Sequence, residues 1–282
     1  MESELRSFFE PTAGAFLRYV VGFSFRYAVI CGGIFLLLKN VAFLRRHKIQ
    51  DDSNERKAHE VRWTVSNTIV TGLFTLLMYA AIEGGYARVY DDIDQYGLGW
   101  LLLSVPLGVV GFDTWFYWQH RALHTPWLFR HCHSVHHKTT NPTTFATFAH
   151  HPIETLSEDT YFLVLILVVP MHPYALGLVG LHAFMLGVLG HMGYEFFPTG
   201  FTRHWLFGWH NTSTHHNMHH SHPGGNYSLY FNWWDRFMGT NHPAYHTYFE
   251  EVKERQALAA ASTVTEAVDD HAASTEWAKA PG

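Results

Sequence analysis

The stretch from residue 98 to residue 124 reads LGWLLLSVPLGVVGFDTWFYWQHRALH, an apolar run that passes directly into two histidines. About 20 such residues form a helix long enough to cross a bilayer. His120 and His124 follow at a spacing of four, which puts both imidazoles on one helix face. The stretch therefore predicts a membrane helix that ends in a pair of metal ligands.

The composition of the whole chain agrees with a membrane protein. Of the 282 residues, 48% are hydrophobic and only 15% are charged, against about 25% charged in soluble domains. The mean hydropathy of −0.06 is low because 23 histidines are averaged into it. A net charge of −5 without a basic block gives no sign of a nucleic-acid partner. Two cysteines in unrelated contexts indicate no disulfide framework.

Three segments are predicted to span the membrane, at residues 16–38, 64–82 and 98–118. A fourth apolar region, residues 161–189, is interrupted at Pro170 and Pro173. We expect this region to form two shorter helices that enter the membrane and return as a re-entrant hairpin. The predicted fold class is therefore all-α, with three spans, a hairpin and a histidine-rich helical cap.

Loop charge predicts the orientation of these spans. The loop at residues 39–62 is basic, whereas the loop at residues 83–97 is mostly acidic. Short basic loops stay on the cytoplasmic side. The third span then returns to that side, so that all later histidines face the cytoplasm. The endoplasmic reticulum and a bacterial inner membrane both fit this topology.

The chain divides into three parts. Residues 1–15 are an N-terminal segment without the basic start of a cleaved signal peptide. Residues 16–253 are the membrane-embedded domain, with the motifs concentrated at about 98–250. Residues 254–282, rich in Ala, Ser, Thr and charges, are expected to be a mobile tail, with at most a short helix.

Seventeen of the 23 histidines lie between residues 120 and 220, and most follow ordered spacings. In H-x2-HH the three imidazoles share one helix face, and the adjacent pair can diverge toward two ions. Imidazole suits iron, zinc, copper and nickel. Nine ligands are too many for one ion, so the pattern favours two. The predicted ligands are His120, His124, His133, His136, His137, His191, His216, His219 and His220.

Other polar residues near the boxes are candidate ligands, or partners that hold the ligand imidazoles in place. Metal-bound histidines usually donate their second N–H to a carboxylate or carbonyl. The candidates are Glu195, His215, His151, Asp113 and Asp235, with Glu154 as a further carboxylate partner. Histidines that neighbour a box without matching its spacing, such as His131 and His150, are expected to serve other purposes.

The order of these motifs resembles a known family. Asp113-Thr-Trp-Phe-Tyr-Trp-Gln-His120 with His124, and His133-Ser-Val-His136-His137 with His151-Pro-Ile-Glu154, are similar to the first boxes of the fatty acid hydroxylase/sterol desaturase superfamily. Gly190-His191-Met-Gly-Tyr-Glu195 resembles a segment of the sterol 4-methyl oxidases. The final box, His215-His216-Asn-Met-His219-His220, and the closing Trp234-Asp235-Arg236 also match. Some members carry a second histidine where this chain has Glu195.

The resemblance implies a membrane-bound non-haem oxidase with two iron ions, O2 as co-substrate and an external electron donor. That donor would be a separate b-type cytochrome, ferredoxin or reductase. It also implies a membrane lipid as substrate, a sterol or a fatty acyl lipid, which reaches the metals through an apolar tunnel. Hydroxylation is favoured over desaturation or demethylation.

Two other classes of protein remain open on the residues alone. A membrane zinc hydrolase uses imidazole ligands without redox chemistry, although no H-E-x-x-H motif occurs here. A metal transporter or sensor is also histidine-rich, but its ligands should follow a path through the spans. Anaerobic turnover with zinc would favour the hydrolase, and metal flux in vesicles would favour the transporter.

Overall fold

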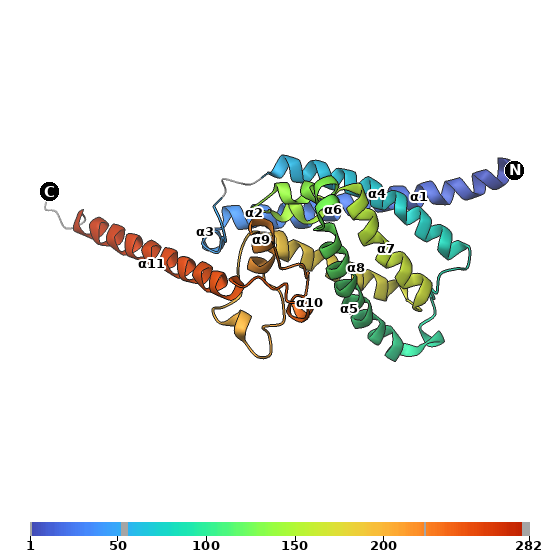
Figure 1. Cartoon of the computed structure of the whole chain (residues 1–282). Helices are drawn as coiled ribbons and strands as arrows, with labels where there is room; N and C mark the ends of the chain where they lie inside the picture. Colours follow the sequence, from blue (N-terminus) through green and yellow to red (C-terminus); the bar gives the residue numbers. More distant parts are fainter. Residues whose placement is uncertain (1, 52–55, 223, 278–282) are drawn as a thin grey trace.

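The computed structural model describes residues 2–51, 56–222 and 224–277 (Figure 1). These residues form helices joined by turns and loops, which confirms the predicted all-α class. The α-helices are α1 (Glu2–Tyr27), α2 (Gly33–Asn40), α3 (Ala42–Arg45), α4 (Lys57–Glu83), α5 (Gly97–Leu123), α6 (Pro126–His131), α7 (Pro152–Val168), α8 (Pro173–His191), α9 (Ser213–Ser221), α10 (Trp233–Phe237) and α11 (Tyr245–Trp277). Tighter 3-10 turns lie at Ile93–Gln95, His133–Lys138, Thr144–Phe148 and Phe201–Arg203.

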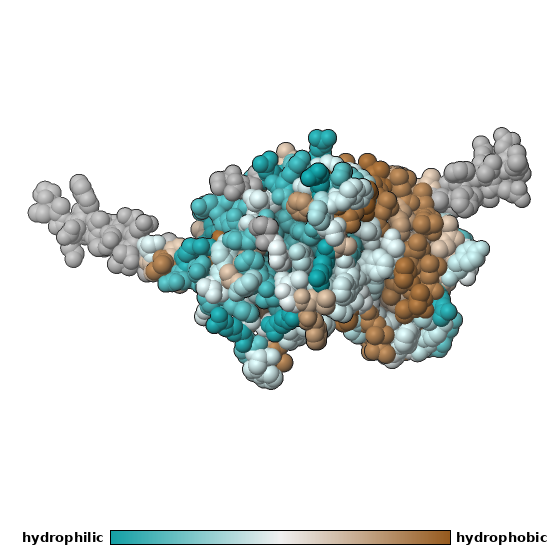
Figure 2. Space-filling model, in the orientation of Figure 1, coloured by the Kyte–Doolittle hydropathy of each residue, from teal (hydrophilic) through white to brown (hydrophobic). Residues whose placement is uncertain are grey.

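Among the described residues, four helical segments are long and apolar enough to cross a membrane. The first three contain the three predicted spans. Their outward faces expose large apolar side chains such as Leu36, Leu73 and Leu102, and apolar residues cover the part of the surface that these helices build (Figure 2). The chain is an integral membrane protein. The four segments are Ala13–Asn40, Lys57–Glu83, Gly97–Leu123 and Pro173–His191.

The two helices predicted on either side of the proline break are present as α7 and α8. The chain leaves α7 after Val168, and Pro173 begins α8 at the first helical position, where a missing N–H costs nothing. The second arm is longer than expected, because the 19 residues of α8 are enough to cross a membrane. α8 ends at His191, so the returning arm delivers a predicted ligand to the cap.

A π-helical turn at Ala28–Gly32 joins α1 to α2 within the first span. Such turns release backbone carbonyls from the regular helix pattern. The carbonyl of Cys31 accepts a hydrogen bond from the Thr144 hydroxyl at 2.8 Å. The first span is thereby tied to the loop between the second histidine box and α7.

Contacts among α5, α7 and α8 form the main core of the membrane region. The Tyr161 hydroxyl donates to the Gly108 carbonyl at 2.6 Å, and Trp115 Nε1 donates to the Ser157 carbonyl at 2.9 Å. A side chain on Gly108 would come within 2.7 Å of Val179, so only glycine permits this approach of α8. These contacts pack both α7 and α8 against α5.

The polar half of the molecule is the cap, residues 124–151 and 192–253, which lies at the ends of the membrane helices (Figures 1 and 2). Tyr245 and Phe249 of α11 are fully buried against Met218 of α9. α11 then projects away from the cap as one helix (Figure 1).

The segment from residue 254, expected to be a mobile tail, continues α11 to Trp277. Its first residues contact both the cap and the segment before α4: Gln256 Nε2 donates to the carbonyls of Glu195 at 3.3 Å and of His47 at 2.8 Å, and Arg255 donates to the Ile49 carbonyl at 3.0 Å. The helix is therefore longer than the short one anticipated. Mobility of the tail stays a prediction, and residues 278–282 lie outside the described part of the chain.

Candidate metal centre

The predicted boxes occupy three elements that meet in the cap. His120 lies in the last turn of α5 and His124 directly follows that helix. His216, His219 and His220 lie on α9. The second box forms a 3-10 turn, His133–Lys138, where the spacing predicts an α-helix. The turn contains the same three histidines. Contacts with other segments, rather than a shared α-helix face, set the directions of their imidazoles.

Five of the nine predicted ligands converge in one group, the five-histidine cluster. Their Nε2 atoms are neighbours: 3.0 Å between His120 and His133, 3.1 Å between His133 and His137, 3.0 Å between His137 and His219, and 3.1 Å between His219 and His124. Three different elements supply them. All five ligand atoms lie within 4.8 Å of one another.

The other four predicted ligands form a second group, the four-histidine cluster. His191 Nε2 lies 3.2 Å from His136 Nε2 and 2.9 Å from His216 Nε2. His220 Nε2 lies 3.2 Å from His216 Nε2. These four residues are all buried. Each adjacent pair, His136–His137 and His219–His220, contributes one residue to each cluster, as the H-x2-HH spacing predicts.

Backbone carbonyls hold several of these imidazoles through the other ring nitrogen. Nδ1 of His120 contacts the Tyr227 carbonyl at 2.7 Å, and Nδ1 of His219 contacts the Gly225 carbonyl at 2.8 Å. His191 and His220 are held in the same way by the carbonyls of Gly187 and Thr139. A carbonyl accepts only, so Nδ1 carries the proton and the Nε2 lone pair points into the cluster.

The protonation of the cluster also suits a metal. Burial lowers the pKa of His219 to about 4 and holds the pKa values of His216 and His220 well below the usual range. These imidazoles are therefore neutral at pH 7. Lone pairs that face one another at 2.9–3.2 Å repel unless a cation lies between them. Metal–nitrogen bonds of about 2.0–2.1 Å place neighbouring ligands at about that separation, so the donor set fits a metal ion in each cluster.

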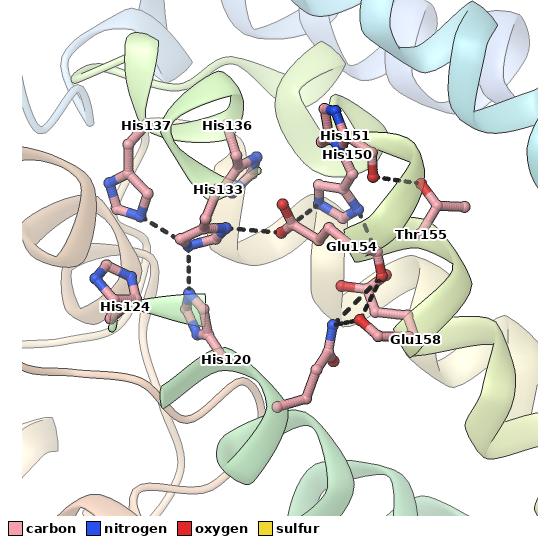
Figure 3. Close-up of polar contacts among 12 residues, drawn as sticks. His120, His124, His133, His136, His137, His150, His151, Glu154, Thr155 and Glu158 are labelled. Atoms are coloured by element: carbon pink, nitrogen blue, oxygen red, sulfur yellow. Dashed lines mark hydrogen bonds and ion pairs between the residues drawn. The ribbon is translucent and has the colours of Figure 1, made fainter. Parts of the chain in front are cut away.

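Glu154 at the start of α7 is the carboxylate partner of His133. Its Oε1 accepts from His133 Nδ1 at 2.9 Å, and both residues are buried (Figure 3). On the other side of Glu154, His150 lies 3.4 Å from a carboxylate oxygen of Glu158. Burial disfavours the charged form of His150, but Glu158 and Glu154 raise its pKa to about 9. His150 is therefore a cation within an ion-pair group, which differs from the neutral ligand clusters.

Glu195 was a candidate ligand, but its geometry is that of a helix cap. Its Oε2 accepts from the Thr214 backbone N–H at 2.9 Å and from the Thr214 hydroxyl at 2.7 Å, and its Oε1 accepts from the Phe197 N–H at 3.0 Å. The bond to the Thr214 N–H satisfies a free donor at the start of α9, and the bond to Phe197 holds the segment that carries Glu195. Glu195 thus orients the helix that carries the third box and lies outside both clusters.

Asp235 and His215 are fully buried next to the centre rather than in it. The two carboxylate oxygens of Asp235 accept from the N–H groups of Tyr227 and Ser228, each at 2.9 Å. His215 Nε2 lies 3.6 Å from Asp235, and its ring packs against Tyr245. Asp235 therefore shapes the loop whose Tyr227 carbonyl holds His120.

Asp113 and His151 also accept hydrogen bonds from backbone N–H groups. Asp113 on α5 accepts from the Tyr230 N–H at 2.7 Å and so ties the segment between α9 and α10 to the membrane region. His151 precedes α7, and its Nδ1 accepts from the Ile153 N–H at 3.3 Å. Both lie outside the two clusters.

A cavity of about 430 Å³ opens beside the two clusters. Its walls come from α1, α4, α5, α7 and α8, with apolar side chains such as Phe23, Phe74 and Phe184. Ring atoms of both clusters line its inner end: His120 and His133 of the five-histidine cluster, and His136, His191 and His216 of the four-histidine cluster. A lipid in the cavity would contact both groups.

Comparison with known proteins agrees with the site. The fatty acid hydroxylase family profile matches residues 105–240, which include every predicted ligand. Rat lathosterol oxidase is 30% identical over 71% of this chain and 68% of its own length. The chain belongs to the fatty acid hydroxylase/sterol desaturase superfamily.

Further relatives within this superfamily are named for oxidations of sterols. The Delta(7)-sterol 5(6)-desaturase of Gibberella zeae is 31% identical over 61% of this chain, which spans about half (52%) of that protein. Rat methylsterol monooxygenase 1 is 30% identical over 77% of this chain and 74% of its length. No solved structure matches the chain.

Sequence reasoning missed some of the residues that complete this superfamily site. The carbonyls of Tyr227, Gly225 and Thr139 hold imidazoles, but a carbonyl has no sequence signature because every residue has one. His150 was set aside for lack of spacing. Its place just before α7, followed by the carboxylates of Glu154 and Glu158, was the available signal.

Proposed function

We propose that this chain oxidises a sterol-type membrane lipid with O2 at two iron ions, one in each histidine cluster. The observation that carries the proposal is the opening of both clusters of neutral imidazoles onto one apolar cavity between membrane helices. The relatives named as a desaturase, an oxidase and a monooxygenase support oxidation and a sterol substrate.

The proposed ligands are the nine histidines of the two clusters, without Glu195. The redox chemistry comes from the iron ions and O2, which together oxidise an unactivated C–H bond. The chain orients the imidazoles through the carbonyls of Tyr227, Gly225, Gly187 and Thr139 and through Glu154. Hydroxylation is favoured, and desaturation follows from the same arrangement.

The cavity excludes water and positions the substrate. Phe112, Phe116 and Leu229 line it close to His120, and they exclude water from the region where the lipid contacts the clusters. A lipid held there presents one or a few carbons to the metals, because positioning within a shaped site decides which bond reacts.

Electrons would come from a separate redox protein, a b-type cytochrome, ferredoxin or reductase, that docks on the cap. The basic loop at residues 39–62 supports a cytoplasmic location of the cap. The host membrane is then either the endoplasmic reticulum or a bacterial inner membrane.

The test is metal analysis and O2 uptake on one detergent-purified preparation. We expect about two irons per chain and O2 consumption that a reductant and a sterol extract stimulate. A His136→Ala and His219→Ala double variant should lose both the bound iron and the O2 consumption. Tightly held zinc with no O2 uptake after iron reconstitution would overturn the proposal and support a zinc hydrolase, and metal flux in vesicles would support a transporter.

A further inference from the structure

One wall of the otherwise apolar cavity is acidic. Glu154, Glu158 and Asp159 on α7 all line it, and we call these three residues the acidic edge. Glu154 is next to His133, whereas Asp159 lies five residues further along the helix. Carboxyl groups at such positions in a membrane region are costly and mark functional sites.

Two oxygens of this edge are buried without a hydrogen-bond partner among the described residues: Glu154 Oε2 and Asp159 Oδ2. Glu154 is only 2% exposed, so water does not satisfy it from the surface. An unsatisfied buried polar atom costs about 1–3 kcal/mol. Because both residues line the cavity, a molecule in the cavity is the natural source of the missing donor.

We propose that the acidic edge binds a hydroxyl group of the lipid substrate. The inference rests on the proposed function and adds the polar group by which the substrate is recognised. Thr71 of α4 lines the same cavity as Asp159, so its hydroxyl is a second polar group at this site.

A hydroxyl fits the edge better than a charged headgroup. A hydroxyl both donates and accepts, so it satisfies a carboxyl group in either protonation state. A lipid carboxylate would be repelled by Asp159, whereas the charge of Glu158 is balanced by His150 at 3.4 Å. A lipid ammonium would also meet Arg26, which lines the same cavity.

The position of the edge places the hydroxyl near the metals. Five helical residues separate Asp159 from Glu154, a rise of about 7.5 Å along α7. Glu154 contacts His133, so the carbons close to the hydroxyl lie nearest to the clusters. The product should therefore be modified at the hydroxyl-bearing end of the lipid rather than at its far end.

Binding to the iron-loaded, detergent-solubilised protein under anaerobic conditions tests the inference without turnover. The probes are tritiated cholesterol and tritiated octadecan-1-ol, with their unlabelled methyl ethers as competitors. We expect saturable binding of at least one alcohol, and its ether should compete about tenfold less well than the free alcohol. Equal competition by alcohol and ether, or no saturable binding of either probe, would overturn it.

Variants connect this selectivity to the edge. Asp159→Asn and Thr71→Val should each reduce the alcohol-to-ether preference several-fold while iron content is unchanged. Thr160→Val is the matched control, because Thr160 is the next residue of α7 and its hydroxyl bonds to the Leu156 carbonyl. An unchanged preference in both edge variants would place hydroxyl recognition elsewhere and contradict the inference.

The two proposals fail separately. Hydroxyl-selective binding without O2 uptake would support hydroxyl recognition by the acidic edge and contradict the proposed oxidase activity. If methyl ethers stimulate O2 uptake as strongly as the alcohols do, the oxidase activity is supported and the proposed role of the acidic edge is contradicted.

Discussion

His219 and His220 are adjacent in sequence, yet their imidazoles belong to different clusters: His219 Nε2 lies 3.0 Å from His137 Nε2, and His220 Nε2 lies 3.2 Å from His216 Nε2. On a helix, neighbouring side chains point about 100° apart. One turn of α9 thereby serves two metal sites, and the two residues can be tested separately.

Replacing each of these histidines by alanine should remove metal from one cluster only. His220→Ala leaves three imidazoles and should lower iron toward one per chain. His219→Ala leaves four imidazoles in the five-histidine cluster and should lose less iron. Elemental analysis measures both, with His131→Ala as the control, because the exposed His131 ring contacts Trp127 and lies outside both clusters. Loss of both irons from each variant would contradict two independent clusters.

Glu154→Ala should weaken metal binding although Glu154 is not a proposed ligand. Removing the partner of His133 Nδ1 frees the ring to rotate, and such changes typically cost about 10–100-fold in metal affinity. Glu154→Gln keeps an oxygen that can accept from His133 Nδ1 and should lose less metal affinity. A chelator titration gives the affinities. Wild-type affinity in Glu154→Ala would show that the 2.9 Å contact does not position the ligand.

Glu195→Ala should destabilise the fold and leave the iron content unchanged. The substitution leaves the Thr214 and Phe197 N–H groups without their acceptor, at a cost of about 1–3 kcal/mol. The thermal midpoint in detergent and the iron content are measured on the same sample. If Glu195 is a ligand instead, one iron is lost.

Acid should destabilise the metal-free protein. The pKa of His219 is about 4 in the folded state, against about 6.5 in an unfolded chain. Between these values the unfolded state binds more protons, so stability is full above about pH 6.5 and falls as the pH drops toward 4. Denaturation of metal-stripped protein at pH 7.5 and pH 5 measures this. Equal stability at the two values would show that the cluster is protonated when folded.

Cysteine labelling tests the side of the membrane on which the cap lies. Asp92→Cys in the acidic loop should react with an impermeant thiol reagent in intact cells, whereas Glu251→Cys on α11 should react only after permeabilisation. The native Cys31 and Cys132 are buried and give a low background. The reverse pattern would place the metal centre outside the cytoplasm.

Much of this architecture follows from local pattern. Apolar length predicts the spans and the proline-broken hairpin, because a bilayer demands about 20 helical residues whatever surrounds them. Imidazole spacing likewise predicts eight of the nine converging histidines, since positions three and four apart meet on a helix. His191 is predicted from its place at the end of the returning apolar arm. The 3-10 turn at His133–Lys138 shows the limit, because spacing alone does not tell a 3-10 turn from an α-helix.

The sequence by itself determined which nine histidines gather, three of which (His120, His124 and His191) lie at the ends of membrane helices. Only the tertiary structure decided that they divide into five and four, because the neighbours of His120 and His191 come from distant segments brought together by packing of α5 and α8. It also decided that Glu154 supports an imidazole while Glu195 caps a helix. Both are buried glutamates near a box, and only the direction of each carboxylate separates their roles.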